Sequence, residues 1–299
     1  MSDDLFCSVD GLLDEDFTHK WLIEHLLPTG AGLLFHGKRG TGKSLLAMAL
    51  AISVLNEGRL FSSWQTRRSG GVLYVQADLP PVLQQDRIKR LVTHFPWLRK
   101  QDLYFYFPVS LDITSLDEDD YLTGELREAE PCLVVWDVLR KIYHGQEAVH
   151  IPAQVYGAAR SLFPDAAHFY IHHDRKTTKD KSEGFLDPAE DFSGVGPWLD
   201  LVTTGWHLEE ETRGQFGLTT TKNNCGPEQG KILLRRDPET LMPVLRMPRI
   251  ADEISRWKSW NIKEGEKLTR GAKEELKRYL LSSFVGVAST IDKVVEAER

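Results

Sequence analysis

Residues 32–55 read GLLFHGKRGTGKSLLAMALAISVL, a short apolar run, a glycine-rich turn and a longer apolar run. Within this stretch, the eight residues from Gly37 to Ser44 fit the pattern G-x-x-x-x-G-K-[ST]. A strand before the turn and a helix after it are the setting in which this pattern forms a phosphate-binding loop. Both are indicated here, so a chance glycine-rich turn is the weaker alternative. We expect the chain to bind a nucleotide.

The residue types in the loop match the chemistry of phosphate binding. Glycines let backbone amides turn toward phosphate oxygens, and the N-terminus of the following helix carries partial positive charge. Lys43 is expected to reach the β- and γ-phosphates, and Ser44 to hold Mg²⁺. The predicted nucleotide-binding residues are Gly37, Lys38, Arg39, Gly40, Thr41, Gly42, Lys43, Ser44 and Leu45.

Outward from the loop, short apolar runs alternate with amphipathic stretches. This alternation predicts an α/β fold with a mostly parallel, twisted sheet flanked by helices. It continues through predicted helices at 117–128 and 153–163 and predicted strands at 132–137 and 168–172. Three later segments, at 199–210, 215–224 and 230–237, look like short strands added antiparallel at the sheet edge.

Three parts of the chain are expected. Residues 1–28 form an N-terminal segment that packs on the core, residues 29–249 form the core domain, and residues 250–299 form a small C-terminal helical extension. Helical apolar spacing occurs at 268–284 and again at 287–299. We favour a pair of docking helices, with part of a winged helix as the alternative.

Composition narrows the class of protein. The 299 residues are 41% hydrophobic and 27% charged, as in soluble globular proteins. The net charge of −7 means that any contact with nucleic acid must come from a local basic patch. Three scattered cysteines favour a reducing compartment, and the cytoplasm is expected. No apolar run approaches the ~20 residues of a membrane span, so no membrane partner is expected.

Two predicted strands end in a carboxylate. The apolar run Leu133–Trp136 ends at Asp137, a candidate Mg²⁺ ligand, and the run Gly71–Ala77 ends at Asp78, a candidate for positioning or deprotonating an attacking water. The carboxyl ends of parallel strands share one edge of a sheet, so both acids should lie beside the phosphate loop. The alternatives are helix capping for Asp137 and a simple strand break for Asp78.

The order of these motifs, followed by the pair His172-His173 and the segment 222–227, resembles the RecA-like ATPases. It is most similar to the RepA-type plasmid and phage replicative helicases, which are DnaB-like, over about residues 29–236. The resemblance implies a RecA-like P-loop core with ATP and Mg²⁺ as cofactors. It also implies a homo-oligomer, such as a hexameric ring, that acts on single-stranded DNA with replication or recombination proteins as further partners.

The resemblance also assigns roles to single residues. The acid at Asp78, normally glutamate in this group, would polarise the attacking water, and His172 would sense the γ-phosphate. Lys222 would reach across a subunit interface into the neighbour's nucleotide. Asn224 stands where DnaB-type helicases carry an arginine finger, so Lys222 or one of the hairpin arginines, Arg235 and Arg236, would supply that charge.

Residues 175–196 are polar and lack strand or helix periodicity, which predicts a long loop. RecA-like motors place DNA-binding loops here, and the candidate DNA contacts are Arg175, Lys176, Lys179 and Lys181. Four acidic residues follow and bring the charge of the loop close to neutral. A solvated loop with no DNA contact is the alternative.

The favoured function is an ATP-hydrolysing translocase or helicase on single-stranded DNA in plasmid, phage or mobile-element replication. The alternative is a regulatory or loader protein of the same fold that hydrolyses ATP slowly and switches partner binding. A small-molecule kinase is a third, weaker hypothesis, because it should show a lid with catalytic arginines. Stimulation of hydrolysis by single-stranded DNA separates the first two.

Overall fold

The structure is a computed structural model, and it describes residues 8–14, 20–61, 64–67, 70–96, 98–116, 121–144, 150–174, 195–227, 230–245, 254, 257–258, 261–262, 268–283 and 295–296. The chain divides into two compact units, residues 1–244 and 245–299. We describe each unit by itself.

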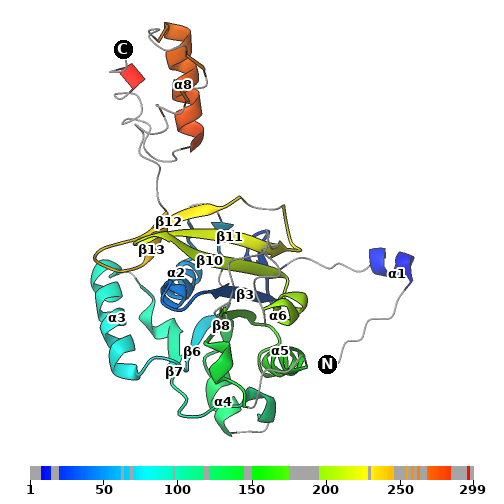
Figure 1. The fold of residues 1–299 in the computed structure, drawn as a ribbon. Helices are drawn as coiled ribbons and strands as arrows, with labels where there is room; N and C mark the ends of the chain where they lie inside the picture. Colours follow the sequence, from blue (N-terminus) through cyan, green and yellow to red (C-terminus); the bar gives the residue numbers. More distant parts are fainter. Residues whose placement is uncertain are drawn as a thin grey trace, which may run out of the picture. The chain divides into compact units, whose positions relative to one another are not determined.

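A nine-stranded sheet organises the first unit (Figure 1). Its strand order is β13-β12-β11-β10-β3-β9-β8-β6-β7. The strands of its parallel part are β3 (Gly32–Gly37), β6 (Gly71–Gln76), β7 (Leu103–Tyr106), β8 (Pro131–Asp137), β9 (Ala167–His173) and β10 (Thr204–Thr212). The antiparallel part adds β11 (Gln215–Asn223) and β12 (Ile232–Arg236), and β13 (Pro243–Leu245) lies beside β12 at the sheet edge. The predicted mostly parallel sheet is confirmed.

The prediction for residues 199–210 was wrong in two respects. The first residues of that segment belong to helix α6 (Gly196–Leu201), which has a proline in its first turn, where proline is favourable because the amide there lacks an intrahelical partner. The strand β10 that follows runs parallel to β3, with His207 opposite His36. It is antiparallel only to β11, with which it forms a hairpin. The antiparallel additions therefore begin at β11, one strand later than predicted.

Helices cover both faces of this sheet. Helix α2 (Lys43–Leu55) packs on β3, β6, β8 and β9. On the other face, α5 (Ile151–Leu162) and α6 cover an apolar core that includes Leu34, Trp136 and Tyr170. Leu73 and Trp136 belong to this core. Because side chains alternate along a strand, the residues that follow them, Tyr74 and Asp137, point to the α2 side. Among the described residues, this unit also contains the α-helices α1 (Val9–Asp14), α3 (Pro81–His94) and α4 (Tyr121–Arg127) and three short 3-10 helices.

Two small hairpins complete the first unit. Strands β1 (Trp21–Ile23) and β2 (Leu27–Pro28) pair antiparallel, as do β4 (Arg59–Leu60) and β5 (Trp64–Gln65). The hydroxyl of Thr204, at the start of β10, donates to the carbonyl of Leu26 at 2.5 Å. The β1–β2 hairpin is thereby tied to the central sheet.

In the second unit, helix α8 spans Arg270–Ser283, which confirms the helix predicted at 268–284. An apolar cluster of this unit contains Ile254, Trp257, Leu268, Leu276 and Val295. The second predicted helix, at 287–299, lies outside the described residues except for 295–296, which are helical.

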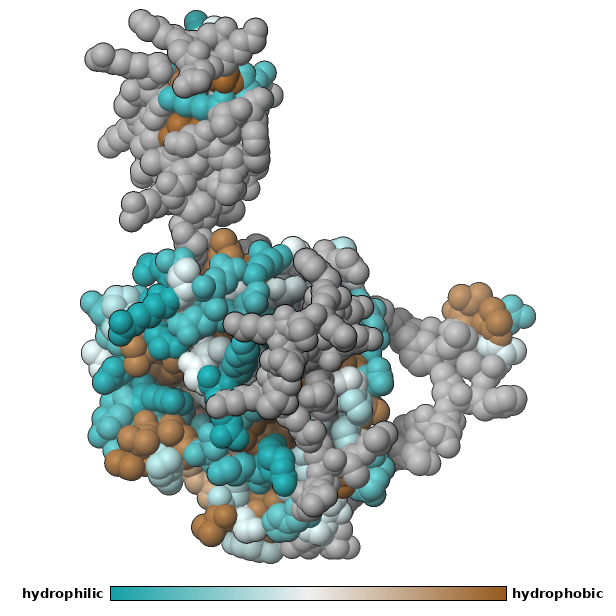
Figure 2. Space-filling view, in the orientation of Figure 1, coloured by the Kyte–Doolittle hydropathy of each residue, from teal (hydrophilic) through white to brown (hydrophobic). Residues whose placement is uncertain are grey.

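The surface drawn in Figure 2 is largely hydrophilic and carries separate apolar patches. Within the part of the chain that the structure describes, we find no helix with the length and hydrophobicity of a membrane span.

Candidate functional site

The phosphate loop joins the end of β3 to the start of α2 and needs glycine for steric reasons. A side chain at Gly37 would collide with the carbonyl oxygen of Leu208 on the neighbouring strand β10. Gly42 precedes α2 with φ of 96°, a left-handed conformation that other residues rarely adopt. The Thr41 hydroxyl donates to the Lys38 carbonyl at 2.9 Å and closes the turn. The loop therefore has the backbone shape that its sequence predicts.

Lys43 lies inside the curve of this loop and is only 3% exposed. Its Nζ donates to the carbonyl oxygens of Gly37 at 2.6 Å and Lys38 at 2.7 Å. Burial lowers the pKa of Lys43 to about 8. Because an ammonium has three donors, these two bonds leave one for a phosphate oxygen. Arg39 and Lys38 are exposed beside it.

Asp137 ends β8 and is buried beside the first turn of α2. Its Oδ2 accepts from the Tyr74 hydroxyl at 2.7 Å and from the Gln76 Nε2 at 3.2 Å. Burial raises the pKa of Asp137, and hydrogen bonds from Tyr74, Ser44 and Gln76 oppose that rise. A carboxylate hydrogen-bonded to the Ser44 side chain supplies the oxygen ligands that Mg²⁺ prefers. The residues present thus fit the ion predicted here.

Gln76 connects this carboxylate to the loop that carries Asp78. Its amide nitrogen donates to Asp137, and its Oε1 accepts from the backbone amides of Asp78 at 3.1 Å and Leu79 at 3.0 Å. The side chain is 2% exposed, so these bonds are shielded from water. We did not identify Tyr74 or Gln76 from the sequence. The signal was present, because alternation along a fully buried strand places both polar side chains on one face.

Asp78 lies at the same edge of the sheet, as its position after β6 predicts. Its side chain is 53% exposed, and its Oδ1 lies 3.4 Å from the Nζ of Lys141. Repulsion from Asp78 contributes to the raised pKa of Asp137. The carboxylate is therefore close to the predicted metal ligand and accessible to water.

The two histidines that end β9 have different surroundings. His172 is 6% exposed and lies against Trp198, with ring centroids 6.4 Å apart. His173 is half-buried, and burial followed by the positive charges of Lys43 and Arg39 lowers its pKa to about 4. Neighbouring residues on a strand point to opposite faces, so His173 is the one on the phosphate-loop side. The γ-phosphate role of His172 stays a prediction.

Two of the candidate trans residues, Lys222 and Arg236, have contacts within their own chain. The Nζ of Lys222 donates to the carbonyl oxygens of Leu199 at 2.8 Å and Asp200 at 3.3 Å, near the end of α6. The Arg236 guanidinium lies over the Phe216 ring at 5.1 Å and is close to Gly42 of the phosphate loop. Arg235 is exposed on β12. Of this set, Arg236 is the residue that the fold brings to the chain's own phosphate loop.

The candidate DNA contacts Arg175, Lys176, Lys179 and Lys181 lie outside the described residues.

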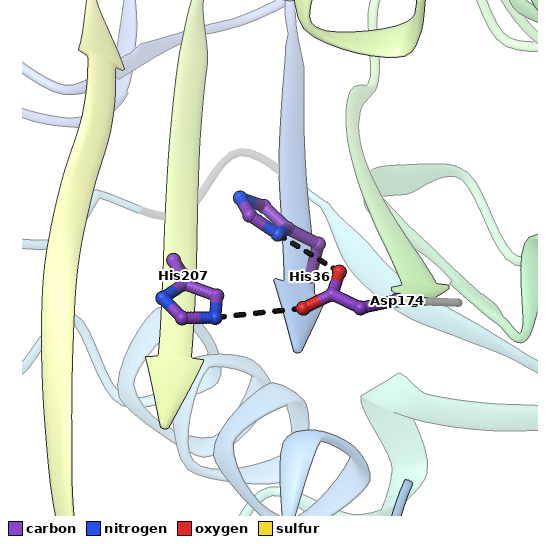
Figure 3. A group of neighbouring side chains, drawn as sticks. All are labelled: His36, Asp174 and His207. Carbon is purple, nitrogen blue, oxygen red and sulfur yellow. Dashed lines mark hydrogen bonds and ion pairs between the residues drawn. The ribbon is translucent and has the colours of Figure 1, made fainter. Parts of the chain in front are cut away.

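A second polar group beside the loop went unnoticed in the sequence. It consists of His36, Asp174 and His207, which come from three neighbouring strand ends (Figure 3). Only the order β9-β3-β10 brings these residues together, so no local motif marks them.

Comparisons with known proteins agree with this geometry. A family model described as an AAA domain (AAA_25) matches residues 4–179. The solved ATPase domain of G40P is similar in structure, with a TM-score of 0.52 at 13% identity over 73% of this chain and 85% of that one. A DnaB-like replicative helicase, solved in a study of its interactions with primase, gives a TM-score of 0.53 at 11% identity over 72% of this chain and 59% of that one. No curated protein sequence matches the chain. These structures confirm the resemblance to RecA-like ATPases at the level of the fold.

Proposed function

Because the chain belongs to the AAA domain family AAA_25, we propose that it binds and hydrolyses ATP with Mg²⁺ and acts on single-stranded DNA as an oligomer. The observation that carries the proposal is the junction of β3, β8 and α2. There a buried lysine, a serine and a buried carboxylate meet at the start of a helix. Each of these groups has a defined task in phosphoryl transfer.

In this proposal the loop amides and Lys43 hold the β- and γ-phosphates, and phosphate oxygens take the remaining donor of the ammonium. Ser44 and Asp137 hold Mg²⁺, which would neutralise charge on the transferred phosphoryl group. Tyr74 and Gln76 fix the orientation of the Asp137 carboxylate. Asp78 orients the water that attacks the γ-phosphate, since it is exposed at the same edge of the sheet.

Action on DNA is supported by the fold and by the basic residues of the sequence at 175–181, which lie outside the described residues. Strand β9, which precedes them in the sequence, ends at the sheet edge that carries the phosphate loop. The solved structure described as a DnaB-like replicative helicase supports a role in DNA replication for this chain. The oligomeric assembly is proposed from the resemblance to RecA-like ATPases.

One observation favours a second function, a slow switch that acts on partner proteins. The acid at position 78 is an aspartate, one methylene shorter than glutamate, and its carboxylate is paired with Lys141. The shorter side chain reaches less far toward a water at the γ-phosphate, and the ion pair with Lys141 competes with that water for the carboxylate. A slowly hydrolysing protein would use nucleotide binding itself to order its partners.

ATP turnover with and without single-stranded DNA separates these functions. The assay is run on the full chain, with Lys43→Ala prepared in parallel to measure contaminating activity. Strong stimulation by DNA, lost in Lys43→Ala, is expected for the DNA-coupled ATPase. Slow turnover that DNA does not change would favour the switch, and turnover equal to that of Lys43→Ala would remove the proposed ATPase activity.

A further inference from the structure

Three histidines form a row across adjacent strands at the edge that carries the phosphate loop. In the parallel register His36 on β3 is opposite His172 on β9 and opposite His207 on β10. The rings of His36 and His207 lie 4.8 Å apart between centroids, with 29° between their planes. Asp174 follows β9 by one residue and places its carboxylate against both of these rings (Figure 3).

The Asp174 carboxylate bridges the two imidazoles. Its Oδ1 lies 3.0 Å from the Nδ1 of His36, and its Oδ2 lies 3.4 Å from the Nε2 of His207. One potential ligand atom from each residue lies within 4.8 Å of the others. In Figure 3 one nitrogen of each ring, Nδ1 of His36 and Nε2 of His207, faces the carboxylate. Two nitrogens and an oxygen therefore converge on one small volume.

From this convergence we propose that His36, Asp174 and His207 form a binding site for a divalent transition-metal ion of the zinc class, separate from the Mg²⁺ site at Ser44 and Asp137. Two imidazoles and one carboxylate form a donor set of nitrogen and oxygen that suits such ions, whereas Mg²⁺ prefers oxygen alone. The proposal does not depend on ATP hydrolysis.

The distances are close to those of a tetrahedral site. With metal–ligand bonds of about 2.0–2.1 Å, neighbouring ligand atoms would lie about 3.3 Å apart, and two imidazole centroids about 5 Å apart. The observed nitrogen–oxygen separations are 3.0 Å to Oδ1 and 3.4 Å to Oδ2 of the carboxylate, and the centroids lie 4.8 Å apart. One ligand atom from each residue lies within 4.8 Å of the others, so an ion would draw these atoms closer together.

The two imidazoles of the proposed site differ in exposure. His36 is fully buried, whereas the His207 side chain is 18% exposed, so an ion would enter from the His207 side and keep an open position there.

The position of the site suggests what a bound ion would do. It would join the strand that leads into the phosphate loop, the end of β9 and the strand β10 in one coordination sphere. A metal bound here would fix Asp174 relative to the strand that ends at Gly37, and it would stabilise the folded state by mass action.

The test is Co²⁺ binding to the full chain, without nucleotide and with millimolar Mg²⁺ to saturate sites made of oxygen alone. Visible absorption of Co²⁺ reports four-coordinate binding, and Zn²⁺ should displace the signal. We expect one such ion per chain and at least a tenfold loss of affinity in His207→Ala and in Asp174→Asn. The matched control is His94→Ala, which removes an exposed histidine that also contacts a carboxylate, Glu239 at 2.9 Å, and should bind as wild type does.

A measurement on the unmodified chain guards against variants that fail to fold. Pulsed electron paramagnetic resonance of bound Cu²⁺ counts coordinated imidazoles, and two are expected. The proposal is overturned if the wild type binds no Co²⁺ in four-coordinate form, if His207→Ala binds as tightly as His94→Ala, or if the Cu²⁺ spectra show no pair of imidazoles. In those cases the group is a hydrogen-bonded triad without metal.

Discussion

The Gln76 bridge allows a sharp prediction, because the chain contains a second buried glutamine with no such bridge. Gln76→Met keeps the approximate length of the side chain and removes three hydrogen bonds: one to the Asp137 carboxylate and one each from the amides of Asp78 and Leu79. The control is Gln84→Met on α3. Gln84 is also 2% exposed, but neither of its amide atoms has a hydrogen-bond partner among the described residues.

The magnitude follows from the bonds. A hydrogen bond to a charged group is worth about 1.5–3 kcal/mol and a neutral one about 0.5–1.5 kcal/mol, and water replaces part of the loss at the partly buried amides. Gln76→Met should therefore lower the free energy of unfolding by about 2–4 kcal/mol. Gln84→Met should leave it unchanged or raise it by about 1–2 kcal/mol, because an unsatisfied buried amide is replaced by an apolar group.

Urea unfolding of both variants measures these free energies, and ATP turnover measures the consequence for the site. Gln76→Met should also reduce kcat by about 10–100-fold with a smaller change in KM, since the bridge positions groups and does not contact substrate. If the two substitutions change stability by the same amount, the bridge has no special energetic role. If Gln76→Met keeps full kcat, the bridge does not position the site.

Three further predictions concern other residues. His168 is buried with a pKa lowered to about 3, so the unfolded protein binds a proton at His168 that the folded protein excludes. The free energy of unfolding should fall by about 1.4 kcal/mol per pH unit as pH drops from about 6.5 toward 3. Urea unfolding at several pH values should show a smaller slope in His168→Gln, and equal slopes in the two proteins would contradict the lowered pKa. Asp78→Glu should keep or raise ATP turnover if Asp78 orients the water, and a tenfold loss would count against that role. Lys222→Met should lower the free energy of unfolding by about 1 kcal/mol, because its ammonium binds two carbonyl groups at the end of α6; unchanged unfolding would show that this contact contributes nothing.

The positions in the fold that the sequence predicts correctly depend on contiguous residues, while the roles proposed for the site residues stay predictions. The phosphate loop needs only its own eight positions and the elements beside it. Asp137 and Asp78 follow from strand ends, because parallel strands bring their carboxyl ends to one edge. Each of these inferences uses local pattern and one general rule of topology.

The features that were missed depend on which strands are neighbours. Gln76 reaches Asp137 because β6 lies beside β8, and the sequence does not give that order. The same holds for the parallel pairing of β10 with β3, because the sequence from β10 onward indicates only an antiparallel hairpin. His36 and His207 are 171 positions apart in the numbering, so no spacing could reveal that they stack. Non-local pairing was the missing information for these contacts, although alternation along β6 alone could have placed Tyr74 and Gln76 on one face.

The central claim is that the loop from Gly37 to Ser44 holds the phosphates of a nucleotide through Lys43. The most direct test of this claim is calorimetric titration of the full chain with MgATP, with wild type and Lys43→Ala compared. The account predicts saturable binding by the wild type and loss of tight binding in the variant, with both proteins equally folded by circular dichroism. Equal affinity of the two proteins for MgATP would contradict it.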